Sequence, residues 1–182
     1  MAPVDTSTLP RLLRDRLDGD DHIRRLEHSG PVASTGDRAA AFPAEEEAAY
    51  HAIRRGALFA VYHPSVVYNP DHPDERRPEN HPHVLLLDGQ VIGTVRIDFL
   101  DGKRAGLRII AIRADLQRRG HGSQLLRFAE AVAREAGCSE VVLNANPDAV
   151  GFYTGNGYTP GPWMDSVPPS SGAVKMGKRI IR

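Results

Sequence analysis

The segment QRRGHGS, residues 117–123, has the residue types of an anion-binding loop. Its two glycines expose backbone N–H groups, and the apolar helical pattern that follows predicts a helix N-terminus with further unpaired donors. Two arginines add positive charge beside these donors. A dinucleotide fingerprint needs a third glycine where this chain has Leu125, and a P-loop needs a lysine where it has Ser123, so neither motif fits. We expect a bound pyrophosphate, and the alternative is a plain turn between a strand and a helix.

Four histidines lie in or beside a stretch rich in Pro, Asn, Asp and Arg, residues 66–82. His63, His72, His81 and His83 raise the question of a metal site, but zinc ligands usually lie on rigid strands or helices. The composition instead predicts a long exposed loop. We therefore expect a solvated loop that borders a substrate cleft, and no metal.

The composition argues against several classes of function. The 182 residues carry 23 Lys and Arg against 23 Asp and Glu, so the formal net charge is zero, and only 6% are aromatic. This balance argues against a nucleic-acid-binding domain and against attraction to an acidic membrane. No secretory segment or long apolar run is evident, and the single Cys138 allows no intrachain disulfide. The sequence predicts one soluble, cytoplasmic domain, with Cys138 as a packed or surface thiol.

Regular strand and helix patterns place the glycine loop between elements of a sheet. Tight turns at residues 88–89 and 101–102 join three strand-like runs into an antiparallel meander. The glycine loop, a helical pattern that ends at Gly137 and a further strand then predict a βαβ unit with its two strands parallel. The expected strands are residues 57–63, 83–89, 90–100, 106–115, 139–145 and 172–180.

Helix signals complete an α+β (mixed α/β) pattern. Residues 44–56 have acidic residues in the first turn, arginines in the last turn and Gly56 as a stop signal. Two more helices are expected, one with Leu12, Leu13 and Leu17 on a face, and one capped by Asn146, begun by Pro147 and ended by Gly155 or Gly157. The sequence therefore predicts a mixed sheet with helices.

This order of elements, with an Asn146-led helix carrying Phe152 and Tyr153 and followed by Gly157 and Tyr158, resembles the GCN5-related N-acetyltransferase (GNAT) superfamily. In that superfamily the signature Q/R-x-x-G-x-G/A binds the pyrophosphate of acetyl-CoA. The resemblance extends over roughly Val84 to Tyr158, so it includes the sheet, the loop and the helices on both sides of it.

The resemblance implies a fold and a co-substrate. The implied fold is a central mixed, mostly antiparallel sheet with splayed central strands, flanked by helices, in a GNAT domain over residues 41–182. Residues 1–40 would be an N-terminal extension or the first helices. The co-substrate would be acetyl-CoA, and no metal is implied.

The same resemblance implies a set of cofactor-binding residues. Backbone amides of the loop would cradle the pyrophosphate, with the side chain of His121 pointing away, and the end of the preceding strand would hold the pantetheine arm by main-chain hydrogen bonds. The implied residues are Ile110, Ala111, Ile112, Gln117, Arg118, Arg119, Gly120, His121, Gly122, Ser123, Asn146 and Tyr153.

Tyr153 matches the tyrosine that in many superfamily members lies near the sulfur and protonates the departing thiolate. A phenol with an ordinary pKa near 10 can donate a proton at neutral pH. The alternative is a core aromatic residue beside Phe152. The resemblance also implies that a backbone N–H near Ile112 stabilises the oxyanion. Direct transfer in a ternary complex gains mainly from positioning and needs no covalent intermediate.

The base that takes the proton from the amine is left open by the sequence. Histone-type members carry a glutamate on the strand before the signature, and the matching position here is Gly106. Asp98 on the neighbouring strand could accept the proton directly or through water, as could His63 or His83. Asp98 could instead be an exposed strand carboxylate, and the amine could also arrive deprotonated without a dedicated base.

The acceptor is expected to be a primary amine of a small molecule. In the superfamily the acceptor cleft is built from segments that here are residues 45–56, the His/Pro-rich loop and residues 161–172 with Trp163 and Asp165. Protein N-termini or lysines are the next possibility, because no recruiting module or charged tail is evident. A CoA-binding module without turnover is a further alternative, against which Tyr153 argues, and a homodimer is left open.

Overall fold

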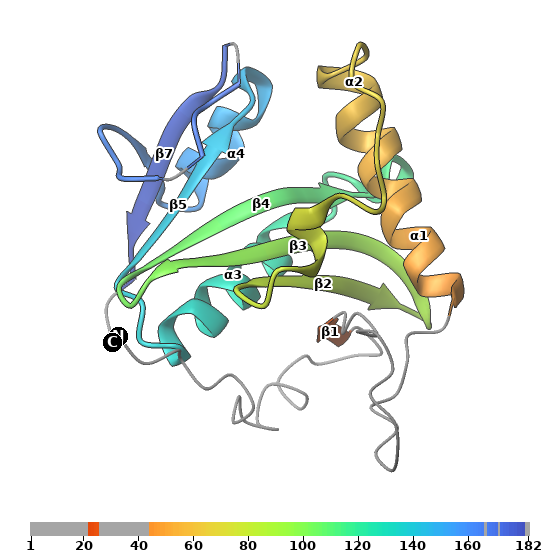
Figure 1. Ribbon diagram of the computed structural model, residues 1–182, viewed down its shortest axis with the longest axis horizontal. Helices are drawn as coiled ribbons and strands as arrows, with labels where there is room; N and C mark the ends of the chain where they lie inside the picture. The colour runs from red at the N-terminus through yellow and green to blue at the C-terminus, as the bar shows by residue number, and fades with distance from the viewer. Residues whose placement is uncertain (1–21, 26–43, 166, 171, 181–182) are drawn as a thin grey trace.

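The computed structural model describes residues 22–25, 44–165, 167–170 and 172–180. These residues form one mixed sheet of seven strands in the order β1-β2-β3-β4-β5-β7-β6, flanked by helices (Figure 1), so the predicted α+β class is confirmed. The strands are β1 (His22–Arg25), β2 (Asn80–Leu87), β3 (Gln90–Asp101), β4 (Arg104–Ile112), β5 (Glu140–Ala145), β6 (Thr159–Pro160) and β7 (Val174–Arg179). The helical segments are α1 (Ala44–Arg54), η3 (Arg55–Phe59), α2 (Ala60–Tyr62), η4 (Pro73–Arg76), η5 (Ala114–Leu116), α3 (His121–Glu135), η6 (Pro147–Ala149) and α4 (Val150–Gly155).

The predicted meander and βαβ unit are both present. β2, β3 and β4 pair antiparallel in succession, and the turn between β2 and β3 has positive φ at Asp88 (49°) and Gly89 (73°). Positive φ at both central residues is the geometry of a primed hairpin turn. β4 and β5, joined by α3, pair in parallel. α3 ends just before Gly137, whose φ of 88° suits a residue without a Cβ.

β4 and β5 pair at one end only. The parallel ladder joins residues 104–106 to residues 140–142, although both strands continue beyond it. On the other side of β4 the register with β3 shifts between Thr94 and Arg96, and Ile109 has a φ of 52°. Positive φ is costly for a β-branched residue, and a bulge of this kind bends its strand. Figure 1 shows β4 and β5 diverging, so the predicted splay of the central strands is confirmed.

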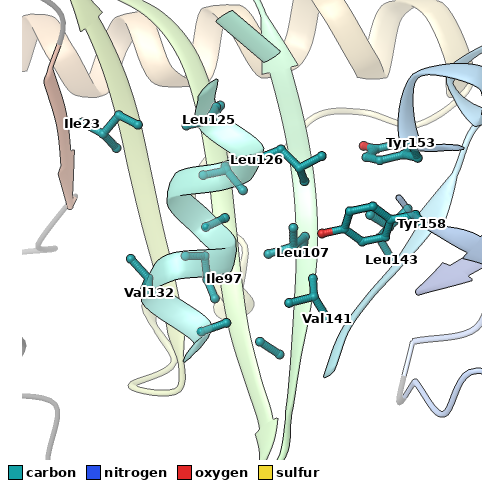
Figure 2. Packing of buried hydrophobic residues seen from close by; sticks show 14 of the residues in the cluster. Ile23, Ile97, Leu107, Leu125, Leu126, Val132, Val141, Leu143, Tyr153 and Tyr158 are labelled. Carbon is teal, nitrogen blue, oxygen red and sulfur yellow. The ribbon is translucent and has the colours of Figure 1, made fainter. Parts of the chain in front are cut away.

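Two apolar clusters fix helices on the two faces of the sheet. On one face α3 contributes Leu125, Leu126 and Ala129, each 0% exposed, to the larger cluster (Figure 2). On the other face α1 contributes Tyr50 and Ile53 to the smaller cluster. Complete burial of one leucine stabilises a fold by about 2–3 kcal/mol. The strands around the split are therefore held from both sides.

Residues 57–63, expected as a strand, are helical. α1 continues through η3 to the end of α2, so Gly56 does not end the helix. Ala57 and Leu58 pack against the cluster under α1. The run ALFAVYH contains only one β-branched residue, so its preference for a strand is weak. Contact with the sheet then stabilises the helical conformation more than a strand.

The stretch 66–82 is less exposed than its composition predicts. Glu75 in η4 is 3% exposed, and the end of the stretch belongs to β2, where His81 and His83 are 0% and 3% exposed. The ring of His83 packs edge-on against Phe128 of α3, with ring centroids 5.1 Å apart. The expectation of one solvated loop was therefore wrong for these residues, because sheet pairing and buried polar contacts hold them in place.

The predicted helix on Leu12, Leu13 and Leu17 lies outside the described residues. Within residues 1–40 only β1 is described; it pairs antiparallel with β2 and buries Ile23. The sequence did not predict this strand.

Candidate active site

A pocket of about 780 Å³ opens where β4 and β5 diverge. Its walls are the helical run of residues 57–63, β4, the glycine loop with the start of α3, and η6 with α4. The pocket brings together all of the predicted cofactor-binding residues except Arg119 and His121, and Asp98 does not line it. Those brought together are Ile110, Ala111, Ile112, Gln117, Arg118, Gly120, Gly122, Ser123, Asn146 and Tyr153.

The glycine loop delivers unpaired donors to this pocket. Arg118 and Gly120 have φ of 61° and 92°, so the chain makes a sharp turn into α3. Gly120 occupies the N-cap position without a side-chain cap, and its carbonyl accepts from the N–H of Gln124. The N–H groups of the first turn therefore have no partner within the helix and can donate hydrogen bonds to a bound anion. Gln117 donates its Nε2 to the carbonyl of Ile112 at 3.1 Å and ties the loop to β4.

Gly122 allows close contact between α3 and α4. A Cβ at this position would lie 3.3 Å from Cζ of Phe152, a ring that also lines the pocket. Gly122 therefore serves the packing of α3 against α4, and this role is compatible with the expected anion contact of the loop.

Main-chain groups of β4 face the pocket beyond the end of its pairing with β5. Residues 107–112 line the pocket, while the ladder to β5 stops at Gly106. Thr94 donates its hydroxyl to the carbonyl of Ile109 at 3.2 Å and helps to fix the bulge. A strand edge of this kind can hold an extended ligand by main-chain hydrogen bonds.

Tyr153 lies on α4 and is 9% exposed, with its ring directed from α4 toward β4 (Figure 2). It packs edge-on between Phe152 and Tyr158, with ring centroids 5.1 and 5.8 Å away. Burial, and then the charge of nearby Tyr62, raise the pKa of Tyr153 well above its ordinary value. Its phenol is therefore protonated at neutral pH and can act as a donor.

Asn146 lines the pocket from the end of β5. Its carbonyl accepts from the N–H of Ala149 at 2.9 Å, but its side chain makes no capping hydrogen bond in η6. The predicted side-chain cap was therefore wrong, because Pro147 begins a 3-10 turn closed by the backbone alone. The Asn146 amide is left to the pocket.

A buried network of charged side chains lies beside the pocket, on the α1 side of the sheet. Glu75 accepts hydrogen bonds from Tyr50 at 2.8 Å, from Arg54 at 2.5 and 2.7 Å, and from Arg96 at 2.9 Å. Burial alone would raise the pKa of Glu75, but Arg54, Tyr50 and Arg96 lower it to about 2. Glu75 thereby fixes η4, whose Asp74 lines the pocket.

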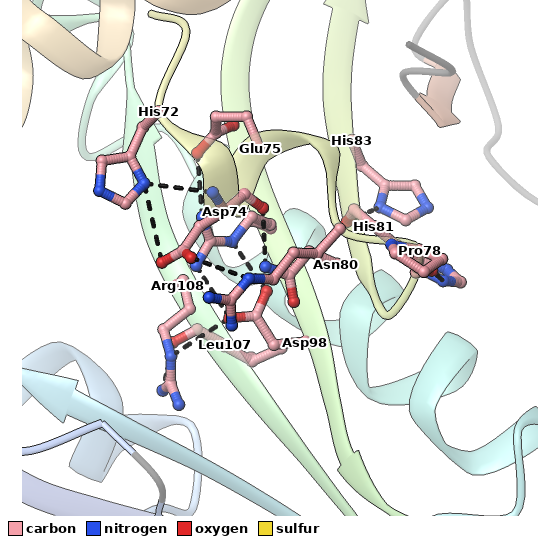
Figure 3. Close-up of polar contacts among 12 residues, drawn as sticks. His72, Asp74, Glu75, Pro78, Asn80, His81, His83, Asp98, Leu107 and Arg108 are labelled. Atoms are coloured by element: carbon pink, nitrogen blue, oxygen red, sulfur yellow. Dashed lines mark hydrogen bonds and ion pairs between the residues drawn. The ribbon is translucent and has the colours of Figure 1, made fainter. Parts of the chain in front are cut away.

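The network of charged side chains continues across β3 and β4. Arg96 holds both carboxylate oxygens of Asp98, at 2.7 and 2.9 Å, and Nε of Arg108 lies 3.6 Å from Asp98 (Figure 3). Asp98 is 6% exposed, and burial raises its pKa in spite of the two arginines. It is therefore not the exposed strand carboxylate that we considered.

Gly106 makes room for the last member of this network. A Cβ at Gly106 would lie 2.6 Å from Nη2 of Arg108, whose guanidinium pairs with Asp165 of the loop before β7. Trp163 anchors the same loop: its Nε1 donates to the carbonyl of Thr159 at 2.8 Å, and its ring covers Gly177. The C-terminal loop is thereby fixed beside the pocket.

Two histidine candidates for the base occupy opposite faces of the sheet. His63 lines the pocket at the end of α2, whereas His83 faces α3 (Figure 3). Beside His63, the hydroxyl of Tyr62 donates to Asp148 of η6 at 2.5 Å and bridges two walls of the pocket. Within the described residues, no group of three or more His, Cys, Asp or Glu could hold a metal ion. None of the described helices is long and apolar enough to cross a membrane.

Sequence reasoning missed Arg96, Arg108, Tyr62 and Asp148. The two arginines had a signal, because each stands in a strand of mostly apolar residues, where a charged side chain needs a partner. Tyr62 and Asp148 had none, since they are far apart in sequence and meet only across the pocket.

Comparison with known proteins assigns the chain to a family. Residues 46–158 match the model of the acetyltransferase (GNAT) family. Over 52 residues the chain is 50% identical to tRNA(Met) cytidine acetyltransferase TmcA of Aeropyrum pernix; the match covers 28% of this chain and only 7% of that protein.

Solved structures share the fold. An acetyltransferase from Streptococcus agalactiae superposes with a TM-score of 0.66 at 13% identity, covering 90% of this chain and 100% of that one. N-acetylglutamate synthase from Neisseria gonorrhoeae, complexed with coenzyme A and L-arginine, gives a TM-score of 0.65 at 17% identity, covering 91% of this chain and 34% of that one. The family model spans most of the domain, including the glycine loop and Tyr153. The chain therefore belongs to the acetyltransferase (GNAT) family of acyl-CoA-dependent N-acetyltransferases.

Proposed function

We propose that this chain transfers acetyl from acetyl-CoA to a primary amine of a small molecule, by direct attack in a ternary complex. The observation that carries the proposal is one pocket that joins three parts: the donor-rich glycine loop, the free edge of β4 and the phenol of Tyr153. The loop suits the pyrophosphate, with Arg118 beside it, and the edge of β4 suits the pantetheine arm.

In this proposal the chain positions the reactants and supplies one proton. A backbone N–H near Ile112 stabilises the oxyanion that forms when the amine attacks the thioester carbonyl. As the carbon–sulfur bond breaks, Tyr153 donates its phenolic proton to the sulfur. Burial disfavours a thiolate in this pocket as it disfavours a phenolate, so the raised pKa of Tyr153 does not prevent the transfer.

The size and walls of the pocket favour a small acceptor. Its volume of about 780 Å³ must take the end of the pantetheine arm, the acetyl group and the acceptor together. Loops close it on two sides: Glu75 fixes the first, and Arg108 with Asp165 fixes the second. The carboxylate of Asp74 faces the same space and would attract a cationic amine.

The experiment measures release of free thiol from acetyl-CoA over a panel of small amines, with thermal melting in CoA as the binding readout. We expect turnover with at least one amine, and a Tyr153→Phe variant that loses about 100-fold or more in kcat while its Kd for acetyl-CoA stays within twofold. Tyr158→Phe is the matched control: it is also a buried tyrosine but does not line the pocket. Binding of CoA without turnover on any amine would contradict the proposal.

A second acceptor class is supported by one observation, the 50% identity with the tRNA cytidine acetyltransferase over 52 residues. The name of that protein gives a cytidine of tRNA(Met) as the group that it acetylates. The zero net charge argues against extended contact with an RNA backbone. Transfer RNA and a short peptide with a free N-terminus therefore belong in the panel, and preference for either would replace the small amine.

A further inference from the structure

The groups that line the pocket differ in their freedom to accept a proton. Asp74 pairs with Arg77 at 3.1 Å and lies 3.8 Å from His72, and Asp148 accepts the hydroxyl of Tyr62. Asp98 lies outside the lining, with both carboxylate oxygens on Arg96. Each of these carboxylates is already committed to a partner.

His63 differs from them among the described residues of the pocket. It follows Tyr62 at the end of α2, it is half-buried, and its ring leans on Phe59 with ring centroids 5.9 Å apart. That contact is with an apolar ring, so it leaves the imidazole nitrogens available to a substrate. Histidine is the side chain whose charge ordinarily changes between pH 5 and 8, as a general base at neutral pH requires.

The surroundings fix the end of α2 over the pocket. Tyr62, the residue before His63, donates to Asp148 at 2.5 Å, and η6 leads directly into α4 with Tyr153. The hydrogen bond to Asp148, together with burial, raises the pKa of Tyr62 to about 12. The charge of an ionised Tyr62 would in turn raise the pKa of Tyr153. Tyr62 and Tyr153 both line the pocket, so the end of α2 and the proposed acid border the same space.

We infer that His63 is the general base that takes the proton from the acceptor amine, and that the Tyr62–Asp148 hydrogen bond positions it. The inference rests on the proposed function. In the step, the amine nitrogen forms a bond to the acetyl carbon and loses one proton to His63. The carbon–sulfur bond breaks, and the sulfur gains one proton from Tyr153. Return of a proton from His63 to Tyr153 through solvent completes the cycle, so atoms and charges balance.

Other groups around the pocket do not reproduce this behaviour between pH 5 and 8. The titratable and charged residues that share the lining with His63 are Tyr62 from α2, Asp74 from η4, Arg96 and Arg108 from β3 and β4, Arg118 from the glycine loop, Asp148 from η6 and Tyr153 from α4. Both tyrosines have raised pKa values and stay neutral, the arginines stay charged, and carboxylates ordinarily ionise below this window.

The test is the pH profile of kcat/KM for His63→Gln and His63→Ala with the best amine from the panel. We expect a loss of 100-fold or more at pH 7, an unchanged Kd for acetyl-CoA, and loss of the ascending limb between pH 5.5 and 7.5. Added imidazole should restore part of the rate to His63→Ala, and an acceptor of low basicity should lose less than an alkylamine. His72→Gln is the matched control, because His72 is exposed and does not line the pocket.

Rates within twofold of the wild type, or a loss that is independent of pH and unaffected by imidazole, would overturn the assignment. Asp148→Asn should lower the rate with a pH profile of wild-type shape, since it disturbs position and leaves the base present. Absence of turnover in the wild type despite CoA binding would refute the proposed function itself, which is a separate outcome.

Discussion

Removal of the charge at Glu75 should destabilise the fold by about 3–5 kcal/mol. In a Glu75→Gln variant Arg54, only 2% exposed, would lose its carboxylate partner, whereas Arg96 would keep Asp98. Breaking a buried pair by neutralising one member costs about 3–5 kcal/mol. The pKa gives an independent figure: it falls from the ordinary 4.5 to about 2, which corresponds to about 3 kcal/mol.

The assay is urea unfolding followed by far-UV circular dichroism. Glu79→Gln is the control, because Glu79 is an exposed glutamate of the same loop, and it should change the free energy of unfolding by less than about 0.5 kcal/mol. The double variant Arg54→Met/Glu75→Gln should recover much of the loss, since it removes the buried cation together with its partner.

The stability that Glu75 contributes to the fold should fall as the pH is lowered. Because the folded pKa of Glu75 is lowered, its ionised form stabilises the fold above the unfolded value of about 4.5, and this contribution is lost as the pH falls toward 2. The difference between wild type and Glu75→Gln should therefore shrink across that window. A variant as stable as the Glu79→Gln control at pH 7, or a double variant as unstable as the sum of the two single changes, would refute the reasoning.

Two glycines give further predictions. Gly120→Ala should lower stability by about 1–2 kcal/mol and weaken CoA binding severalfold, because its φ of 92° disfavours a Cβ, although no atom lies within 4 Å of it. Gly155→Ala, where a Cβ would also meet no atom within 4 Å but φ is not positive, should leave CoA-dependent melting unchanged; equal behaviour of the two variants would contradict this account. Gly177→Ala should displace Trp163, since the new Cβ would lie 2.2 Å from its ring, and an unshifted tryptophan emission would show that the indole does not cover this strand.

The part of the fold that the sequence predicted well depends on local signals. The hairpin turn at Asp88 and Gly89, the glycine loop and the stop at Gly137 each require a backbone conformation that a few neighbouring residues reveal. Residues 57–63 could not be assigned in the same way. Their short apolar run fits a strand or a buried helix equally, and its contacts with the sheet decide between them.

The buried charges could not be predicted as a network. Glu75 lies in a stretch whose composition indicates solvent, yet it meets Arg54 and Arg96, each 21 residues away in sequence. Arg108 and Asp165 are 57 residues apart. A charged residue in an apolar strand signals that a partner exists, but the chain alone does not say which of the many carboxylates it is.

Gly106 links the charge network to the choice of base. A glutamate side chain at this position would meet the space that the guanidinium of Arg108 occupies, and the glycine leaves that space open. Arg108 in turn binds Asp165 and lies beside Asp98, so both of these carboxylates are held in ion pairs. In the proposed mechanism the proton acceptor therefore comes from another wall of the pocket. We assign that role to His63 at the end of α2, and the charge network that fixes the loops beside the pocket is the physical reason for this assignment.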